Sequence, residues 1–143
     1  MAVVTAEEFV QMAAVSNMFE IQSSMMAKEA ESAEVKAFAE QMIVDHTKAG
    51  EELGAAADSA PPETLDAKHQ AMIDELATVK GTELEKKYVQ MQVAAHEEAV
   101  ALFTSYSENG EDEELKAFAT KTLPTLQMHF DHIKGIAGAA PRG

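Results

Sequence analysis

The sequence predicts an all-α protein, and specifically a four-helix bundle, from three observations. Apolar residues recur at steps of three and four positions, which is the period of amphipathic helices, and alternating strand patterns are missing. Only 7 glycines and 4 prolines interrupt the 143 residues. Two short segments of the first half recur in the second half, which indicates that one helical hairpin is present twice.

The helix boundaries of the first half follow from capping residues and prolines. Residues 5–8 (Thr-Ala-Glu-Glu) form a capping box that starts the first helix. Ser32 is the expected N-cap of the second helix. Pro61 and Pro62 mark the clearest break, because two successive prolines do not continue a helix. A shorter helix is expected to follow from about residue 64 to 78.

The second half is expected to contain two long helices. A second capping box at residues 82–85 (Thr-Glu-Leu-Glu) starts the first of them, and the Asn-Gly pair at 109–110 ends it. The acidic run 111–114 then lies at the positive N-terminus of the last helix. Pro124 is expected to kink this helix or to start a new turn, and residues 139–143 are expected to form a frayed tail.

The repeat consists of two matches at nearly the same offset. Residues 9–12 (Phe-Val-Gln-Met) recur 79 positions later as residues 88–91 (Tyr-Val-Gln-Met). Residues 36–39 (Lys-Ala-Phe-Ala) recur 80 positions later as residues 116–119. One match falls in each helix of a hairpin and the order is kept, so the chain is interpreted as two copies of a helical hairpin.

The lengths of the connections indicate the topology. Two or three residues join the helices within each hairpin, so these helices must be antiparallel neighbours. Helices of about 26 residues span about 39 Å, and the linker at 58–81, with its own short helix, can run that whole length. This predicts a crossover with the second and third long helices parallel, as in ferritin-like bundles. The expected organisation is a single domain, 1–143, with hairpins at about 5–57 and 82–138.

Composition excludes several classes of protein. The absence of cysteine excludes disulfide scaffolds, Cys₄ zinc sites, iron–sulfur clusters and thiol catalysis. A formal charge of −14 argues against a nucleic-acid partner or an anionic membrane surface. No apolar run approaches the roughly 20 residues that span a bilayer, so no transmembrane segment is expected. The first five residues have neither the basic nor the apolar region of a signal peptide.

Polar residues on the core faces are expected to meet at mid-bundle. Counting along the expected helices places one metal-capable side chain from each long helix within about 7 Å of one axial height. These side chains are Glu20, His46, His96 and His129, and Asp45 shares the layer. Helical bundles commonly build metal sites from facing helices in this way. The sequence therefore makes these five residues candidate metal ligands.

The ligand types favour some metals over others. Di-iron and di-manganese bundles need two Glu-x-x-His motifs, whereas residues 43–46 read Ile-Val-Asp-His and residues 129–132 read His-Phe-Asp-His. Three histidines with one or two carboxylates suit zinc, copper or nickel better than a di-iron centre, with zinc or copper favoured. The alternative is a buried polar network in which imidazoles and acids satisfy one another and fix the helix register.

Other candidate residues have simpler interpretations. Met12, Met18, Met25 and Met26 do not form a tight thioether cluster and are interpreted as deformable core packing. His69, on the short linker helix, is expected at the surface. No phosphate-binding loop, serine-nucleophile motif or zinc-protease motif is present.

Several motifs along the chain together resemble one known family. They are Phe9, Glu20, the segments 34–39 and 42–46, His96, and the segments 115–119 and 123–129. With these motifs residues 9–137 resemble the bacterial ferritin-like family catalogued as domain of unknown function 4142, whose members are often labelled outer-membrane or secreted proteins. The resemblance implies a ferritin-like bundle exported to the periplasm or beyond. It implies no established activity.

Three hypotheses for the function follow. The first is an exported protein that binds a transition-metal ion at Glu20, Asp45, His46, His96 and His129, for metal buffering or stress protection. The second is a non-enzymatic structural or interaction module of the cell envelope, whose central polar layer is structural. The third is a di-metal oxidase or catalase-type enzyme, which the missing Glu-x-x-His motifs disfavour. The sequence leaves open whether the chain forms a homo-oligomer.

Overall fold

The computed structural model describes residues 4–139, which fold into five helices. They are α1 (Ala6–Ala27), α2 (Ala33–Ala56), α3 (Ala67–Leu76), α4 (Gly81–Asn109) and α5 (Glu113–Ala139). Within these residues no strand is present. Of the tail expected at 139–143, Ala139 is instead the last residue of α5, and 140–143 lie outside the described part, as do the first three residues of the chain.

Three of the four long helices begin as local side-chain chemistry predicts. At α1, the Thr5 hydroxyl accepts from the Glu8 amide at 3.1 Å, and the Glu8 carboxylate accepts from the Thr5 amide at 2.9 Å, which confirms the capping box. Ser32 accepts from the Val35 amide at the start of α2. The Asp112 carboxylate accepts from the Leu115 amide, at 3.0 Å, at the start of α5.

The capping box predicted at residues 82–85 is wrong. The helix α4 begins one residue earlier, at Gly81, and its N-cap is Lys80, which makes no side-chain capping bond. Gly81 has a φ of 61°, a conformation that only glycine adopts readily, and this turns the chain from α3 into α4. The glycine conformation starts this helix in place of the Thr82 hydroxyl.

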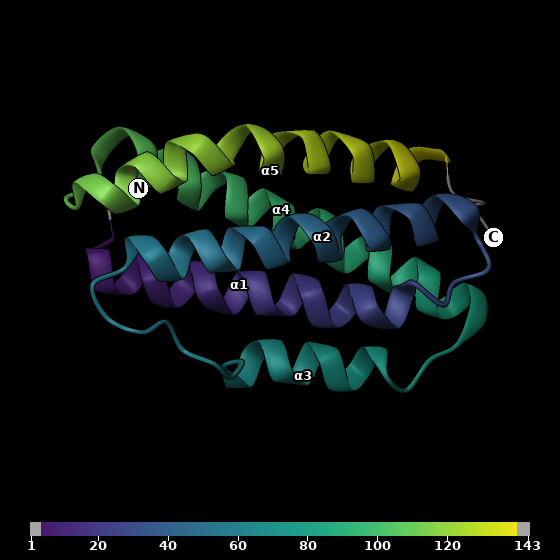
Figure 1. Ribbon diagram of the computed structural model, residues 1–143. Coiled ribbons are helices and arrows are strands. Elements are labelled where there is room, and N and C mark those ends of the chain that lie inside the picture. The colour runs from purple at the N-terminus through teal and green to yellow at the C-terminus, as the bar shows by residue number, and fades with distance from the viewer. Residues whose placement is uncertain (1–3, 140–143) are drawn as a thin grey trace.

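The four long helices form a ferritin-like bundle in which α3 is the crossover. The hairpins α1–α2 and α4–α5 pack with α1 against α4 and α2 against α5, and α3 lies outside the bundle against α1 and α4 (Figure 1). Because α3 carries the chain back along the length of the bundle, α2 and α4 run in the same direction. This confirms the predicted parallel crossover.

Two apolar clusters fill the ends of the bundle. The first lies where α1 and α5 begin and α2 and α4 end, and it includes Phe9, Leu53, Phe103, Tyr106 and Phe118. The second lies at the opposite end and includes Phe38, Met42, Leu76, Tyr88 and Ile133. The middle of the bundle contains buried polar side chains, which separate the two clusters.

The repeated segments occupy equivalent positions at opposite ends. Phe9 packs on Phe118 in the first cluster with ring centroids 6.4 Å apart and an interplanar angle of 68°. Their repeat counterparts, Tyr88 and Phe38, pack in the second cluster at 6.4 Å and 62°. The two hairpins are therefore related by an approximate two-fold rotation that exchanges the ends of the bundle.

Several local expectations differ from the structure. Met12 and Met25 are 48% and 49% exposed, so interpreting them as core residues was wrong. The side chain of His69 is only 17% exposed, because its ring packs against Phe19 at 5.4 Å, so it is not the surface residue expected. The helix α5 continues through Pro124 as a single helix, and no new helix starts there.

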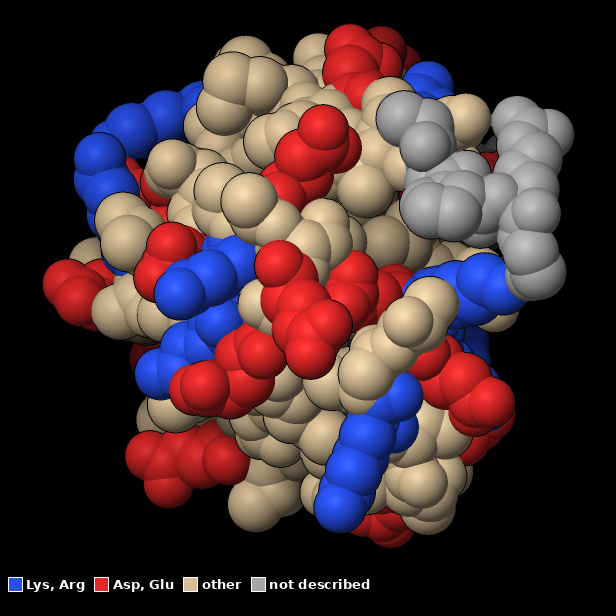
Figure 2. Space-filling view, turned by 90° about the vertical axis from the view of Figure 1, so that its right-hand side faces the viewer, with Lys and Arg blue, Asp and Glu red and all other residues tan. Residues whose placement is uncertain are grey.

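The outer surface carries mixed charge. Figure 2 shows the end of the bundle where α1 is joined to α2, and acidic and basic side chains alternate there without a continuous basic patch. None of the helices, over the residues described, is both long enough and apolar enough to cross a membrane.

Candidate metal centre

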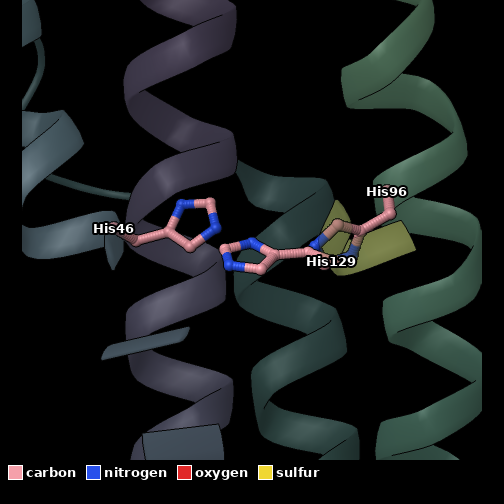
Figure 3. Close-up of side chains that lie close together, drawn as sticks. All are labelled: His46, His96 and His129. Atoms are coloured by element: carbon pink, nitrogen blue, oxygen red, sulfur yellow. The ribbon is translucent and has the colours of Figure 1, made fainter. Parts of the chain in front are cut away.

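Three histidines from three helices meet at the middle of the bundle. His46 comes from α2, His96 from α4 and His129 from α5, and their exposures are 6%, 1% and 2%. One nitrogen of each ring lies within 4.8 Å of a nitrogen of both other rings. Figure 3 shows the three side chains extending from their helices toward one another. The structure thus brings the three predicted histidines into one cluster.

In each ring, one of the two nitrogens is held by an oxygen atom outside the cluster. The Nδ1 atom of His46 lies 2.7 Å from Asn17 Oδ1, and the Nδ1 atom of His96 lies 2.8 Å from the Gln92 carbonyl oxygen. The Nε2 atom of His129 lies 2.7 Å from Asp45 Oδ2. Since these oxygens accept, each held nitrogen donates its proton, which sets the tautomer of the ring.

The remaining nitrogens are buried and have no hydrogen-bond partner within the described part of the chain. They are Nε2 of His46, Nε2 of His96 and Nδ1 of His129. In the tautomers set by the outer hydrogen bonds, each of these atoms carries a lone pair rather than a proton. Three lone pairs in one small buried volume form a set of ligands for a cation.

Asn17 and Gln92 were missed by the sequence analysis. Asn17 holds His46 twice, because its Nδ2 also donates to the His46 carbonyl oxygen at 2.8 Å. The repeat offset of 79 places Asn17 at the position of His96 in the other hairpin, and this signal was available in the sequence. Gln92 lies four residues before His96, one helical turn away on the same face of α4.

Glu20 places a buried carboxyl group beside the cluster. It lies on α1, is 2% exposed, and its Oε2 is 3.5 Å from Nε2 of His96. Both of its oxygens lack a close hydrogen-bond partner among the described residues. Burial raises the pKa of Glu20 well above the ordinary 4.5, although a hydrogen bond from the Gln92 side chain opposes this shift.

Asp45 and His132 lie outside the cluster. The Asp45 carboxylate bonds to the outer nitrogen of His129 and accepts from Gln41 Nε2 at 2.9 Å, and its side chain is 23% exposed. It lies behind His129 rather than among the unpaired nitrogens. His132 is exposed and contacts the Phe38 ring at 5.2 Å. Four of the five predicted residues therefore share the buried layer, and Asp45 supports it from outside.

The buried environment keeps all three rings neutral at pH 7. Burial lowers the pKa of His46 well below 6.5, and the neighbouring imidazoles lower it further. Burial lowers the pKa of His96 to about 4. It also lowers the pKa of His129, although Asp45 opposes this shift. Neutral imidazole is the form that binds a metal ion, so the rings need not lose a proton first.

The donor set restricts the metals that this layer could hold. Two nitrogens bound to one ion at about 2.0–2.1 Å are at most about 4.2 Å apart. The ring nitrogens here lie within 4.8 Å of one another, so the rings would move inward slightly to bind the same ion. Three imidazoles and one carboxylate suit zinc or copper. Within the described residues the layer has no second carboxylate aimed inward to bridge two irons, so it does not fit a di-iron centre.

Solved structures with the same fold include a copper-bound protein. The chain is similar to CopM in the Cu(II)-bound form, with a TM-score of 0.77 and 19% identity over 96% of this chain and 98% of that one. It is also similar to a DUF305 fragment from Deinococcus radiodurans, with a TM-score of 0.81 and 16% identity over 98% of this chain and all of that one. At such identities the likeness establishes the fold alone.

The sequence comparisons identify the family. No curated protein matches the chain significantly. Residues 1–136, which include the whole histidine cluster, match the family described as a domain of unknown function (DUF4142). This match confirms the resemblance inferred from the sequence motifs, and the chain belongs to that family.

Proposed function

We propose that this protein binds one transition-metal ion, copper or zinc, through His46, His96 and His129, with Glu20 as the fourth ligand. The observation that carries the proposal is the set of three buried ring nitrogens that converge without hydrogen-bond partners. Each ring is oriented by an oxygen on its other nitrogen, which is the usual arrangement around metal-bound histidine. Copper is the first ion to test, because the similar structure of CopM holds Cu(II).

The alternative, a purely structural polar layer, is less favoured by the same atoms. In such a network the buried groups would pair with one another, since a buried group without a partner costs about 1–3 kcal/mol. Here His46 and His129 each leave one nitrogen without a partner, and the Glu20 carboxyl group has only the Gln92 side chain and, at 3.5 Å, Nε2 of His96 beside it. A bound ion would satisfy the three ring nitrogens together, and Glu20, 3.5 Å from the His96 ring, lies beside them as a further ligand.

The role that we propose is metal binding for buffering or stress protection, outside the cytoplasm. The enclosed site supports storage rather than turnover, because the ligands are buried. The proposal that the protein is exported rests on its resemblance to a family whose members are often labelled secreted or outer-membrane proteins. Fractionation of cells that express the full-length gene product tests this part, and recovery only from the cytoplasm would contradict it.

Metal titration of protein purified without an affinity tag tests the binding. We expect about one Cu²⁺ or Zn²⁺ per chain at micromolar or lower Kd, and stabilisation of about 2.7 kcal/mol at a free metal concentration of 100 Kd. His46→Ala and His96→Ala should each weaken binding at least about tenfold. His69→Ala is the matched control, because His69 lies on α3 outside the cluster.

The outcomes separate the two functions. If the wild type binds no transition metal at micromolar concentration, or if both variants bind as tightly as the wild type, metal binding is rejected. If the two variants lower the melting temperature while the wild type binds no metal, the polar layer is structural.

A further inference from the structure

The histidine cluster is closed on most sides. The two apolar clusters fill the bundle above and below it, so a hydrated ion cannot travel along the axis. On the side of α1 and α4, the crossover helix α3 covers the bundle, and its His69 ring lies on Phe19, next to Glu20 in the chain. Among the residues described, 4–139, no further helix covers the opposite pair, α2 and α5 (Figure 1).

Two hollows in the surface differ in what they reach. The larger, of about 560 Å³, lies between α1, α4 and the crossover segment, and neither Glu20 nor any histidine of the cluster lines it. The smaller, of about 130 Å³, lies between α2 and α5, and both His46 and His129 line it together with Asp45. Of these two hollows, the smaller cleft, between α2 and α5, leads to the candidate ligands.

The cleft between α2 and α5 continues inward. A small hollow of about 20 Å³ shares four lining residues with it, namely His46, Ala49, Thr122 and Leu126, and also touches Asn17. Most of its lining is apolar, and it extends the open space beside the cleft to His46 and Asn17.

Asp45 lies where solvent and cluster meet. Its side chain is 23% exposed, and its Oδ2 is 2.7 Å from Nε2 of His129, whose side chain is 3% exposed. We propose that a hydrated divalent cation enters and leaves through the cleft between α2 and α5 and docks first on the Asp45 carboxylate. This inference rests on the proposed function and adds the route to it.

Two exposed ion pairs offer a matched test of the route. Lys121 of α5 pairs with Glu52 of α2, and both line the cleft between α2 and α5. Lys68 of α3 pairs with Glu98 of α4, and both line the larger groove. The two lysine side chains are 69% and 66% exposed, so replacing either one disturbs little packing.

The first experiment measures the association rate of Cu²⁺ by stopped flow. Lys121→Glu and Lys68→Glu each change the net charge from −14 by two units. We expect Lys121→Glu to raise the rate about threefold or more at low ionic strength and Lys68→Glu to change it less than twofold. The acceleration should vanish at high salt, since salt screens exposed charges. Equal effects, a larger effect of Lys68→Glu, or no effect would overturn the route.

A second pair of variants tests steric access. Ala49 lines the cleft between α2 and α5 and Ala95 lines the larger groove, and both are half-buried alanines close in sequence to a cluster histidine. We expect Ala49→Leu to slow association and dissociation of Cu²⁺ by the same factor, with Kd unchanged, and Ala95→Leu to leave both rates unchanged. Slowing by Ala95→Leu alone would overturn the route.

Equilibrium binding separates the two proposals. A wild type that binds no Cu²⁺ at equilibrium overturns both the proposed function and the route. A wild type that binds Cu²⁺ normally, with rates that neither pair of variants changes as expected, overturns the route alone.

Discussion

The Asp45 carboxylate and the His129 ring are joined by a hydrogen bond of 2.7 Å that leaves the other nitrogen of His129 facing the cluster. The bond links a partly exposed residue of α2 to a buried residue of α5 that lies 84 positions away in the chain. It therefore orients one candidate ligand from outside the site.

Replacement of this carboxylate tests the orienting bond. We expect Asp45→Asn to weaken metal binding about 10- to 100-fold. The neutral amide makes a weaker hydrogen bond to His129 than the carboxylate does, and the ring then becomes a weaker ligand for the metal ion. Asp131→Asn is the control, since Asp131 also lies on the bundle surface, is 78% exposed and pairs with Lys134 in its own helix. Competition with a chromophoric chelator measures both affinities. Equal affinities for the two variants would contradict the assignment.

Gly50 provides the space for Asn17. A Cβ atom at Gly50 would lie 2.8 Å from Asn17 Nδ2, the atom that donates to the His46 carbonyl oxygen. We expect Gly50→Ala to displace the amide, release the His46 ring and weaken metal binding by about tenfold. Gly54→Ala lies on the same helix with nothing within 4 Å, so it should leave affinity unchanged and stabilise the fold by about 0.5–1 kcal/mol. Isothermal titration and urea unfolding measure the two quantities.

The buried acid Glu20 makes the stability of the metal-free protein depend on pH. Its pKa is raised by burial, so above pH 4.5 the unfolded chain releases a proton that the folded chain still holds. The free energy of unfolding should fall by about 1.4 kcal/mol per pH unit until the folded pKa is reached. Glu20→Gln should lack this decline. Urea unfolding of both proteins between pH 5 and pH 8 measures it, and parallel curves would show that Glu20 is not buried as described.

The three histidines should change the free energy of unfolding with pH in the direction opposite to Glu20. Their pKa values are lowered by burial, that of His96 to about 4. Below pH 6.5 the unfolded chain binds protons that the folded chain does not, so their contribution to stability is present above pH 6.5 and lost as the pH falls. NMR titration of the metal-free rings should show His96 neutral down to about pH 4. In 6 M urea the same ring should titrate near pH 6.5, and a midpoint near 6.5 in the folded protein would contradict the burial.

Much of the fold was predictable because it depends on local patterns. Along α5, buried residues recur at steps of three and four positions, from Leu115 and Phe118 through Leu126 and His129 to Ile133 and Ile136. Such a face follows from periodicity alone. The start of α4 was not predictable in this way, since Lys80 and Gly81 begin the helix through a backbone conformation that depends on how the chain leaves α3.

The candidate site was predictable in its members and not in their roles. Helix length and direction place Glu20, His46, His96 and His129 at one height, because the rise per residue is constant. Asp45 and His46 are adjacent in sequence, and no local rule says which of them faces inward. Only the packing of α2 against α5 directs Asp45 to the outer nitrogen of His129.

The sequence by itself determined the two repeated hairpins, the crossover and the height of the polar layer. Each of these follows from the periodicity, the repeated segments and the linker length, which can be read along the chain without knowing how the helices pack. The tertiary structure alone decided which nitrogen of each ring is free and which side of the bundle is open. These features depend on contacts such as those of Asn17 with His46 and of α3 with α1, which join residues far apart in sequence. Hydrogen-bond geometry across helices is set by packing, and packing is a property of the assembled bundle.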